Sequence, residues 1–280
     1  MMRGRCEPIR PAGMLAAALL TLVVAAIAAP ASAGDAAANA KAAGLADRFV
    51  FLRDVDPTIL QDMRYAGRHN FVGERIDGYE AAECILTEPA ARALKRVQDE
   101  LRGRGLSLKV YDCYRPARAV AHFVRWAEKA GDQGMKAEFY PKVDKGKVFA
   151  LGYIARRSGH SRGSSVDLTI VKLPPAFQPD YLPGEPLTAC TAPVGERYPD
   201  NGLDYGTGYD CFDDKSHTGS TAVGAEARAN RKFLVEAMRR AGFSNYAKEW
   251  WHYDFGKPPY PKTYFDFPVT AHPEAIPGAQ

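Results

Sequence analysis

The sequence lacks several features that would each point to a particular class of protein. After Ala33 it has no apolar run that approaches the roughly 20 residues needed to span a bilayer. It has no internal repeat and no glycine-rich loop of the kind that cradles phosphate groups. No two cysteines show the close C-x2-4-C spacing that a zinc–cysteine cluster favours. These absences argue against a membrane domain, a phosphate-binding loop and a structural zinc–cysteine site.

A concentrated positive charge is also missing. The 280 residues carry a formal net charge of +4, and residues 1–33 hold three of the arginines and one glutamate, so their loss would leave +2. Proteins that bind nucleic acids normally present a basic face, and we therefore expect no such partner. With 46% hydrophobic and 25% charged residues, the composition is that of an ordinary globular chain with one core.

The first residues have the layout of a secretory signal peptide. Three arginines precede an uncharged run over residues 14–29, and Pro30 and the small-residue triplet Ala31-Ser32-Ala33 follow it. A short apolar run that ends in an A-x-A site is typical of a cleaved leader rather than a membrane anchor. We expect residues 1–33 to be removed and the protein to be exported, periplasmic or secreted, without stable membrane insertion.

Four cysteines remain once Cys6 leaves with the leader: Cys84, Cys113, Cys190 and Cys211. An even set in an oxidising compartment favours disulfides. Three pairings are possible for four cysteines. We favour Cys84 with Cys113 and Cys190 with Cys211.

The rest of the chain alternates irregularly between helical and strand patterns. Residues 34–48 are alanine-rich without strong periodicity, which suggests a loose lead-in before a domain over 49–280. Helical spacing and strand-like alternation are found in separate stretches: helices are expected over 87–103, 116–127 and 225–241, and strands over 106–110, 166–171 and part of 249–255. Residues 172–208 are dense in Pro, Gly and Asp and predict a long surface loop. We expect a single α+β domain with a mainly antiparallel central sheet flanked by helices.

Two separated fragments contain the residue types of a metal site. Residues 158–167, SGHSRGSSVD, place His160 and Asp167 seven positions apart around a small-residue turn that enters a strand. Residues 249–252, EWWH, add His252 and a carboxylate three positions before it. A catalytic zinc typically has three such protein ligands and one open position. Positions 249 and 252 would point to opposite faces of a regular strand, so this interpretation requires a turn or a bulge there.

Other polar residues have simpler interpretations. No G-x-S-x-G elbow accompanies Ser161, Ser164 and Ser165, which argues against a serine hydrolase. Three histidines have no partner at a ligand spacing and are expected at the surface, in packing or behind the metal ligands: His69, His122 and His217. The two tryptophans of the EWWH fragment are expected in the core and the pocket wall.

Five fragments in order, DMRYA, YDCYRP, SGHSRGSSVDLT, GTGYD and EWWHY, resemble the motifs of the zinc D-alanyl-D-alanine dipeptidases, from about Arg53 to Phe267. The resemblance implies one zinc ion per chain, on the sheet, with a set of ligands that matches His160, Asp167 and His252. It implies that Glu249 is the general base and that Arg115 lies beside the scissile carbonyl. It also implies four residues that shape the substrate pocket or hold the substrate's ends: Asp112, Ser158, Tyr65 and Asp210, the last as a partner for the substrate ammonium.

The implied activity is hydrolysis of D-alanyl-D-alanine, or a similar small D,D-dipeptide, in the cell envelope, by a metal-activated water with Glu249 as base. One alternative is a zinc D,D-carboxypeptidase that acts on peptidoglycan stem peptides. Another is a zinc-stabilised module that binds cell-wall peptides without cleaving them. The presence of Glu249 and Arg115 argues against that module, because neither residue is needed merely to hold zinc.

Overall fold

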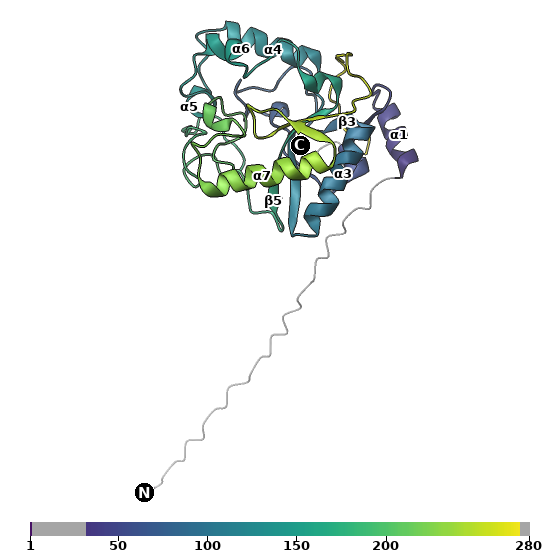
Figure 1. The fold of residues 1–280 in the computed structure, drawn as a ribbon, viewed down its shortest axis with the longest axis horizontal. Coiled ribbons are helices and arrows are strands. Elements are labelled where there is room, and N and C mark those ends of the chain that lie inside the picture. The colour runs from purple at the N-terminus through teal and green to yellow at the C-terminus, as the bar shows by residue number, and fades with distance from the viewer. Residues whose placement is uncertain (2–31, 275–280) are drawn as a thin grey trace.

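The computed structural model describes residue 1 and residues 32–274 (Figure 1). The expected leader lies almost wholly outside these residues. Within the described part of the chain, no helix has the length and apolar character needed to cross a membrane.

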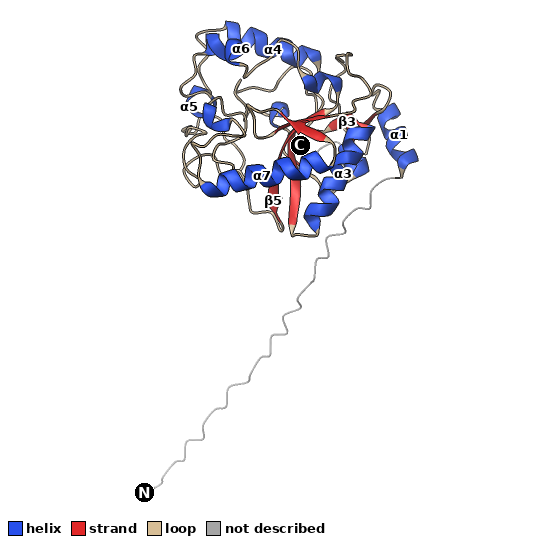
Figure 2. Cartoon of the chain, in the orientation of Figure 1, coloured by secondary structure: helices blue, strands red, loops and turns tan. Residues whose placement is uncertain are grey.

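A mixed five-stranded sheet forms the centre of the molecule, in the order β2-β4-β5-β7-β6 (Figure 2). Its strands are β2 (Leu60–Gln61), β4 (Leu106–Asp112), β5 (Ser165–Lys172), β6 (Phe243–Asn245) and β7 (His252–Phe255). Only β2 and β4 run parallel; the other neighbours are antiparallel. A separate antiparallel pair joins β1 (Phe49–Phe51) to β3 (Ile85–Thr87). The predicted α+β architecture with a mainly antiparallel sheet is confirmed.

The helices lie around this sheet (Figure 1). The longer ones are α1 (Ala33–Ala42), α3 (Glu88–Arg102), α4 (Ala117–Glu128) and α7 (Ala225–Arg240), and the four-residue ones are α2 (Leu52–Val55), α5 (Lys136–Phe139) and α6 (Val148–Leu151). Four short 3-10 turns complete the described elements: η1 (Arg64–Ala66), η2 (Lys145–Lys147), η3 (Gly159–Arg162) and η4 (Asp214–Ser216). The three helices expected from periodicity are present close to their predicted bounds.

The sheet has one apolar face and one face that carries polar groups. Val166, Leu168 and Ile170 of β5 belong to the same buried cluster as residues of α3 and α7. Successive side chains of a strand point to opposite faces, so Asp167 lies on the other side of the sheet. By the same alternation, the side chain of His252 lies on the other face of the sheet from that of Tyr253, which belongs to the apolar cluster. The polar face is where the sequence fragments of the expected metal site meet.

The alanine-rich lead-in is not loose, and that expectation is wrong. It forms helix α1, whose N-cap Ser32 and Asp35 make a reciprocal capping box. Ala36 and Ala40 are buried, and Asn39 donates to Asp54 at 3.2 Å. Alanine has the highest intrinsic helix propensity, and two small side chains on one face suffice for docking, although they give little periodic signal.

Residues 173–208 form the predicted loop, without a helix or strand among them, and Lys172 is the last residue of β5 instead of the first of the loop. The loop is nevertheless tied to the sheet. Asp200 accepts hydrogen bonds from Arg64 at 2.7 Å and from Lys109 at 2.8 Å, and both basic side chains are buried. Arg64 and Lys109, which hold the loop through Asp200, are both distant from it in the sequence.

Both disulfides have the pairing that we favoured, Cys84–Cys113 and Cys190–Cys211. The second bond closes a segment with a sequence separation of 21 and fastens the end of the long loop. Replacing Cys190 and Cys211 together by serine should lower the free energy of unfolding by about 3 kcal/mol, because the unfolded chain regains its freedom. Urea denaturation measures this change. An unaltered free energy would contradict it, and oxidised wild-type protein with both bonds intact is the reference.

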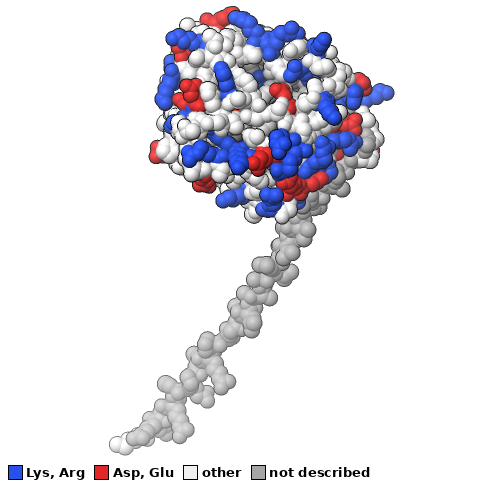
Figure 3. Space-filling model, in the orientation of Figure 1, with Lys and Arg blue, Asp and Glu red and all other residues white. Residues whose placement is uncertain are grey.

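Charges of both signs are mixed on the face seen in Figure 3. Basic side chains are the more numerous there, but acidic ones lie among them. Arg240 of α7 pairs with Glu100 of α3 at 2.6 Å. The surface in this view has no uninterrupted basic patch.

Candidate active site

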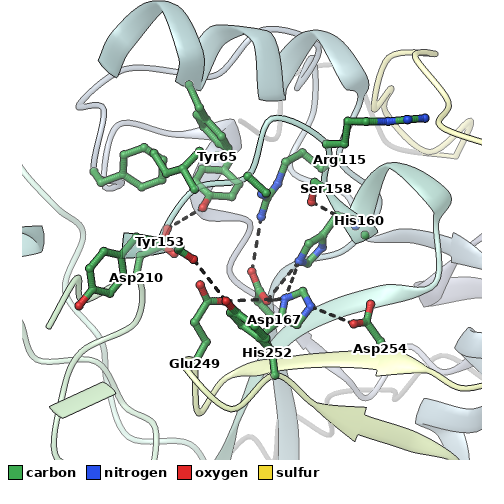
Figure 4. Close-up of a pocket in the computed structure, with 18 residues that line it drawn as sticks. Tyr65, Arg115, Tyr153, Ser158, His160, Asp167, Asp210, Glu249, His252 and Asp254 are labelled. Atoms are coloured by element: carbon green, nitrogen blue, oxygen red, sulfur yellow. Dashed lines mark hydrogen bonds and ion pairs between the residues drawn. The ribbon is translucent and has the colours of Figure 1, made fainter. Parts of the chain in front are cut away.

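Three side chains with metal-binding atoms converge on the polar face of the sheet (Figure 4). His160 comes from η3, Asp167 from β5 and His252 from the start of β7, where Asp167 and His252 are direct cross-strand neighbours. His252 Nδ1 lies 3.0 Å from Asp167 Oδ1 and 3.1 Å from His160 Nε2. His160 Nε2 is 3.3 Å from the same carboxylate oxygen. One potential ligand atom from each residue lies within 4.8 Å of the other two.

The donor set fits a divalent metal ion such as zinc. His160 Nδ1 lies 2.7 Å from the backbone carbonyl of Cys113, which can only accept, so Nδ1 carries the proton. The lone pair of Nε2 therefore faces Asp167 and His252. Two imidazoles and one carboxylate are a ligand combination that suits catalytic zinc.

The electrostatics of the same group favour a cation. Burial opposes a charge on Asp167, yet the two histidines hold the pKa of this carboxyl well below its usual range. Burial would lower the pKa of the His252 imidazole, but the hydrogen bond with Asp167 and the nearby carboxylate of Asp254 raise it to about 10. The site thus attracts positive charge, which a metal ion would supply in place of a proton.

Glu249 lies beside this group. The turn or bulge that the sequence analysis required between positions 249 and 252 is present as a turn. This turn links Glu249 to His252, whose backbone N–H donates to the Glu249 carbonyl at 3.3 Å. Both side chains therefore reach the same pocket, with Glu249 Oε2 3.9 Å from His252 Nδ1. Burial raises the pKa of Glu249 to about 7, with His252 opposing the rise and Asp167 adding to it. A carboxyl group with such a pKa can both accept and return a proton near neutral pH.

Arg115 is held in the pocket wall by Asp112. The fully buried Asp112 carboxylate accepts from Arg115 Nε at 2.9 Å and from the Tyr79 hydroxyl at 2.5 Å. Arg115 Nη2 lies 3.6 Å from Asp167 Oδ2, and its guanidinium faces the ring of Tyr65. Asp112 itself does not line the pocket. The salt bridge between Asp112 and Arg115 therefore orients the guanidinium of Arg115 toward the three candidate metal ligands.

Asp210 and Tyr65 close another side of the pocket. The Tyr65 hydroxyl donates to Asp210 Oδ2 at 2.6 Å. Asp210 is buried in a left-handed backbone conformation with φ 54°. Burial raises the pKa of this carboxyl well above its usual value, the charge of Asp167 adds to the rise, and Tyr65 and Arg115 offset it. Asp210 lines the pocket with its carboxyl bound to the Tyr65 hydroxyl.

The pocket between these groups is small, about 190 Å³, below the roughly 300–1,000 Å³ of most small-molecule sites. All the predicted site residues except Asp112 line it, including Ser158, whose Oγ accepts from the backbone N–H of His160 at 3.2 Å. Aromatic and aliphatic side chains also line it, Phe71, Phe123, Tyr153, Ile154 and Tyr246, together with the charged side chains of Arg157 and Asp254.

The other histidines and the tryptophans lie outside this site. The predictions for the histidines agree with their contacts: His69 bonds Glu138, His122 contacts Glu74, and His217 lies near Asp214. Both tryptophans are buried in the core, but neither lines the pocket, so the pocket-wall part of that prediction is wrong.

Sequence reasoning missed three residues that support the site. Tyr79 holds Asp112, and the Tyr209 hydroxyl donates to Asp167 Oδ2 at 3.0 Å. The sequence could have indicated Tyr209, since it stands inside the GTGYD fragment. Asp254, beside His252, also lines the pocket, and only the strand pairing reveals its position.

Comparison with known proteins adds an independent finding. A family model described as D-ala-D-ala dipeptidase, of the M15 peptidases, matches residues 45–175 and 198–270. A D-alanyl-D-alanine dipeptidase of Streptomyces coelicolor is 38% identical over 221 residues, 79% of this chain and 98% of that protein. One from Enterococcus faecium is 34% identical over the same shares. The crystal structure of a vancomycin-resistance D,D-pentapeptidase mutant with Zn(II) matches with TM-score 0.33 and 15% identity, over 65% of this chain and 78% of that one. The family match omits residues 176–197, which belong to the long loop.

Proposed function

This chain belongs to the D-alanyl-D-alanine dipeptidase family of M15 peptidases, and on that premise we propose that it hydrolyses free D-alanyl-D-alanine or a similar small D,D-dipeptide. The observation that carries the proposal is the convergence of His160, Asp167 and His252 beside Glu249 in one small pocket. These three side chains would hold one zinc ion per chain. Zinc held there would supply Lewis acidity, which polarises a carbonyl group and makes water a stronger acid.

Glu249 is the proton carrier in this proposal. Its carboxylate would take a proton from the attacking water and then return it to the nitrogen of the departing amine. Its position in the pocket and its pKa of about 7 both support this role. The proton therefore stays on one Glu249 oxygen between the two transfers.

Arg115 would donate to the carbonyl oxygen of the scissile peptide as negative charge develops there. Asp112 binds the guanidinium from behind and restrains its orientation. A donor already in place need not reorganise during the reaction, which is the basis of its effect.

Asp210 would bind the substrate ammonium, with Tyr65 holding the carboxylate in place, and Ser158 would help shape the pocket around the remaining end. A dipeptide of two alanines has little apolar surface, so its charged ends must provide most of the orientation. A carboxypeptidase would need room for the rest of a stem peptide, whereas Asp210 and Tyr65 close the pocket at that side. This contact favours the dipeptidase over the carboxypeptidase.

Blocking the substrate amine should therefore abolish most activity. We expect kcat/KM for N-acetyl-D-alanyl-D-alanine to fall about 5–150-fold below that for the free dipeptide, because 1–3 kcal/mol is lost when a buried acceptor has no partner. Steady-state kinetics on both compounds and on a stem pentapeptide measure the ratios.

Asp210→Ala should lose this preference, whereas Asp214→Asn, at a carboxylate that is 90% exposed, should keep it. Equal or faster cleavage of the N-acetyl dipeptide or the pentapeptide would replace the dipeptidase proposal with the carboxypeptidase.

We also propose that residues 1–33 are removed and that the domain acts in the cell envelope. Two disulfides, which persist in oxidising compartments, support this location. Removal of residues 1–33 would take away the N-cap Ser32 of α1, but the contacts by which this helix docks, through Ala36, Ala40 and Asn39, lie after the cut. We therefore expect residues 34–48 to stay folded against the catalytic domain proposed from residue 49.

A further inference from the structure

The strand pairing that brings Asp167 and His252 together also brings together a second pair of polar side chains on the same face of the sheet. In the antiparallel pairing of β5 with β7, Asp167 stands opposite His252 and Ser165 stands opposite Asp254. Residues two positions apart on a strand share a face of the sheet. Ser165 and Asp254 therefore lie on the same face as the proposed metal ligands.

The Asp254 carboxylate contacts the far side of the His252 ring. Its Oδ1 accepts a hydrogen bond from Ser165 Oγ at 2.5 Å. Its Oδ2 lies 3.6 Å from His252 Nε2, a contact drawn in Figure 4. The other ring nitrogen, Nδ1, faces Asp167 and His160. The His252 imidazole thus lies between the other two candidate metal ligands on one side and the Asp254 carboxylate on the other.

Gly159 leaves the space that this arrangement needs. A Cβ atom at this position would stand 2.8 Å from Ser165 Oγ and 2.9 Å from Asp254 Oδ1, closer than a carbon atom can approach. Gly159 belongs to η3, the same turn that presents His160. The turn and the Ser165–Asp254 pair are therefore packed against each other.

We propose that Asp254, held by Ser165, is a positioning residue for His252, an inference that rests on the metal site proposed above. At 3.6 Å the contact is wider than a direct hydrogen bond, so the carboxylate acts on the ring through its charge. That charge favours the tautomer with its proton on Nε2 and leaves the Nδ1 lone pair free for the metal. The Cys113 carbonyl fixes the opposite tautomer in His160 at 2.7 Å.

Asp254→Asn removes the charge and keeps the shape of the side chain, including an acceptor for Ser165. We expect the dissociation constant for zinc, measured by chelator competition, to rise about 10–100-fold, the usual cost of losing an outer partner of a metal ligand. Release of zinc to excess chelator should accelerate in the same direction. Ser165→Ala should give a smaller rise, because the carboxylate remains but is less restrained.

Asp266→Asn is the matched control, since Asp266 is a comparably exposed carboxylate that pairs with Arg118 away from the site. Its zinc affinity should equal that of the wild type. Urea unfolding of the metal-free proteins separates positioning from a structural role. Unchanged zinc affinity in Asp254→Asn would overturn the proposal, whether or not its stability falls. If the wild type itself binds no zinc, the proposed function fails instead.

Discussion

Glu249→Gln is expected to lower kcat by about 10²–10⁴-fold, the usual contribution of a positioned general acid or base. The amide has nearly the same shape as the carboxyl group, but it cannot accept and return a proton. Glu249 is not one of the three candidate ligand residues, and its Oε2 lies 3.9 Å from His252 Nδ1. Zinc content and fold should therefore be retained while turnover is lost.

The pH profile tests the same assignment. Glu249 must be deprotonated to accept a proton, so kcat/KM of the wild type should rise with pH through its pKa and level off above it. Burial raises that pKa to about 7, and a cation held by the adjacent ligands would lower it from this value. The rising limb should therefore lie at or below neutral pH, and Glu249→Gln should lack it.

Glu226→Gln is the control for this substitution, since Glu226 is exposed in the first turn of α7. Its kinetics should match those of the wild type. A kcat of Glu249→Gln within a few-fold of the wild-type value would assign Glu249 a structural role.

His160→Ala is expected to abolish both stable zinc binding and activity. The imidazole would supply one of three protein ligands, and its loss should weaken affinity by more than the 10–100-fold typical of an outer partner. Asp167 and His252 alone would leave an incomplete ligand set. Metal analysis of the purified protein and the rate of D-alanyl-D-alanine hydrolysis measure the two effects.

Thermal unfolding provides an independent measure of the same site. A ligand that binds only the folded state raises the melting temperature, and the rise is larger for tighter binding at a given ligand concentration, so zinc should stabilise the wild type and not His160→Ala. His217→Ala is the control, because that histidine lies outside the pocket. Full zinc content and full activity in His160→Ala would refute the assignment of the ligands.

Local patterns predicted those elements whose stability comes from their own periodicity. Helix α3 follows the spacing of Leu94, Val97 and Leu101, all of which are fully or almost fully buried. Thr87 stands at the N-cap position of this helix, but its hydroxyl contacts Ser164 Oγ and makes no capping hydrogen bond. The α1 helix was missed because its docking relies on two alanines and on a bond between Asn39 and Asp54.

The chemistry of the candidate site was contained in the sequence, because zinc chemistry requires particular residue types and these stand in compact fragments. Imidazole and carboxylate groups at 160, 167 and 252, with a further carboxylate at 249, predicted a metal site, and the resemblance of their fragments to the dipeptidase motifs predicted the peptidase activity. Tertiary structure alone decided how these groups meet. The register of β5 against β7 sets His252 opposite Asp167 and adds Asp254 behind it, since cross-strand neighbours are distant in sequence. Likewise, the partners of Asp210 and Asp112 come from Tyr65 and Tyr79. Local propensity cannot specify such contacts, because they depend on which distant surfaces the core packing brings together.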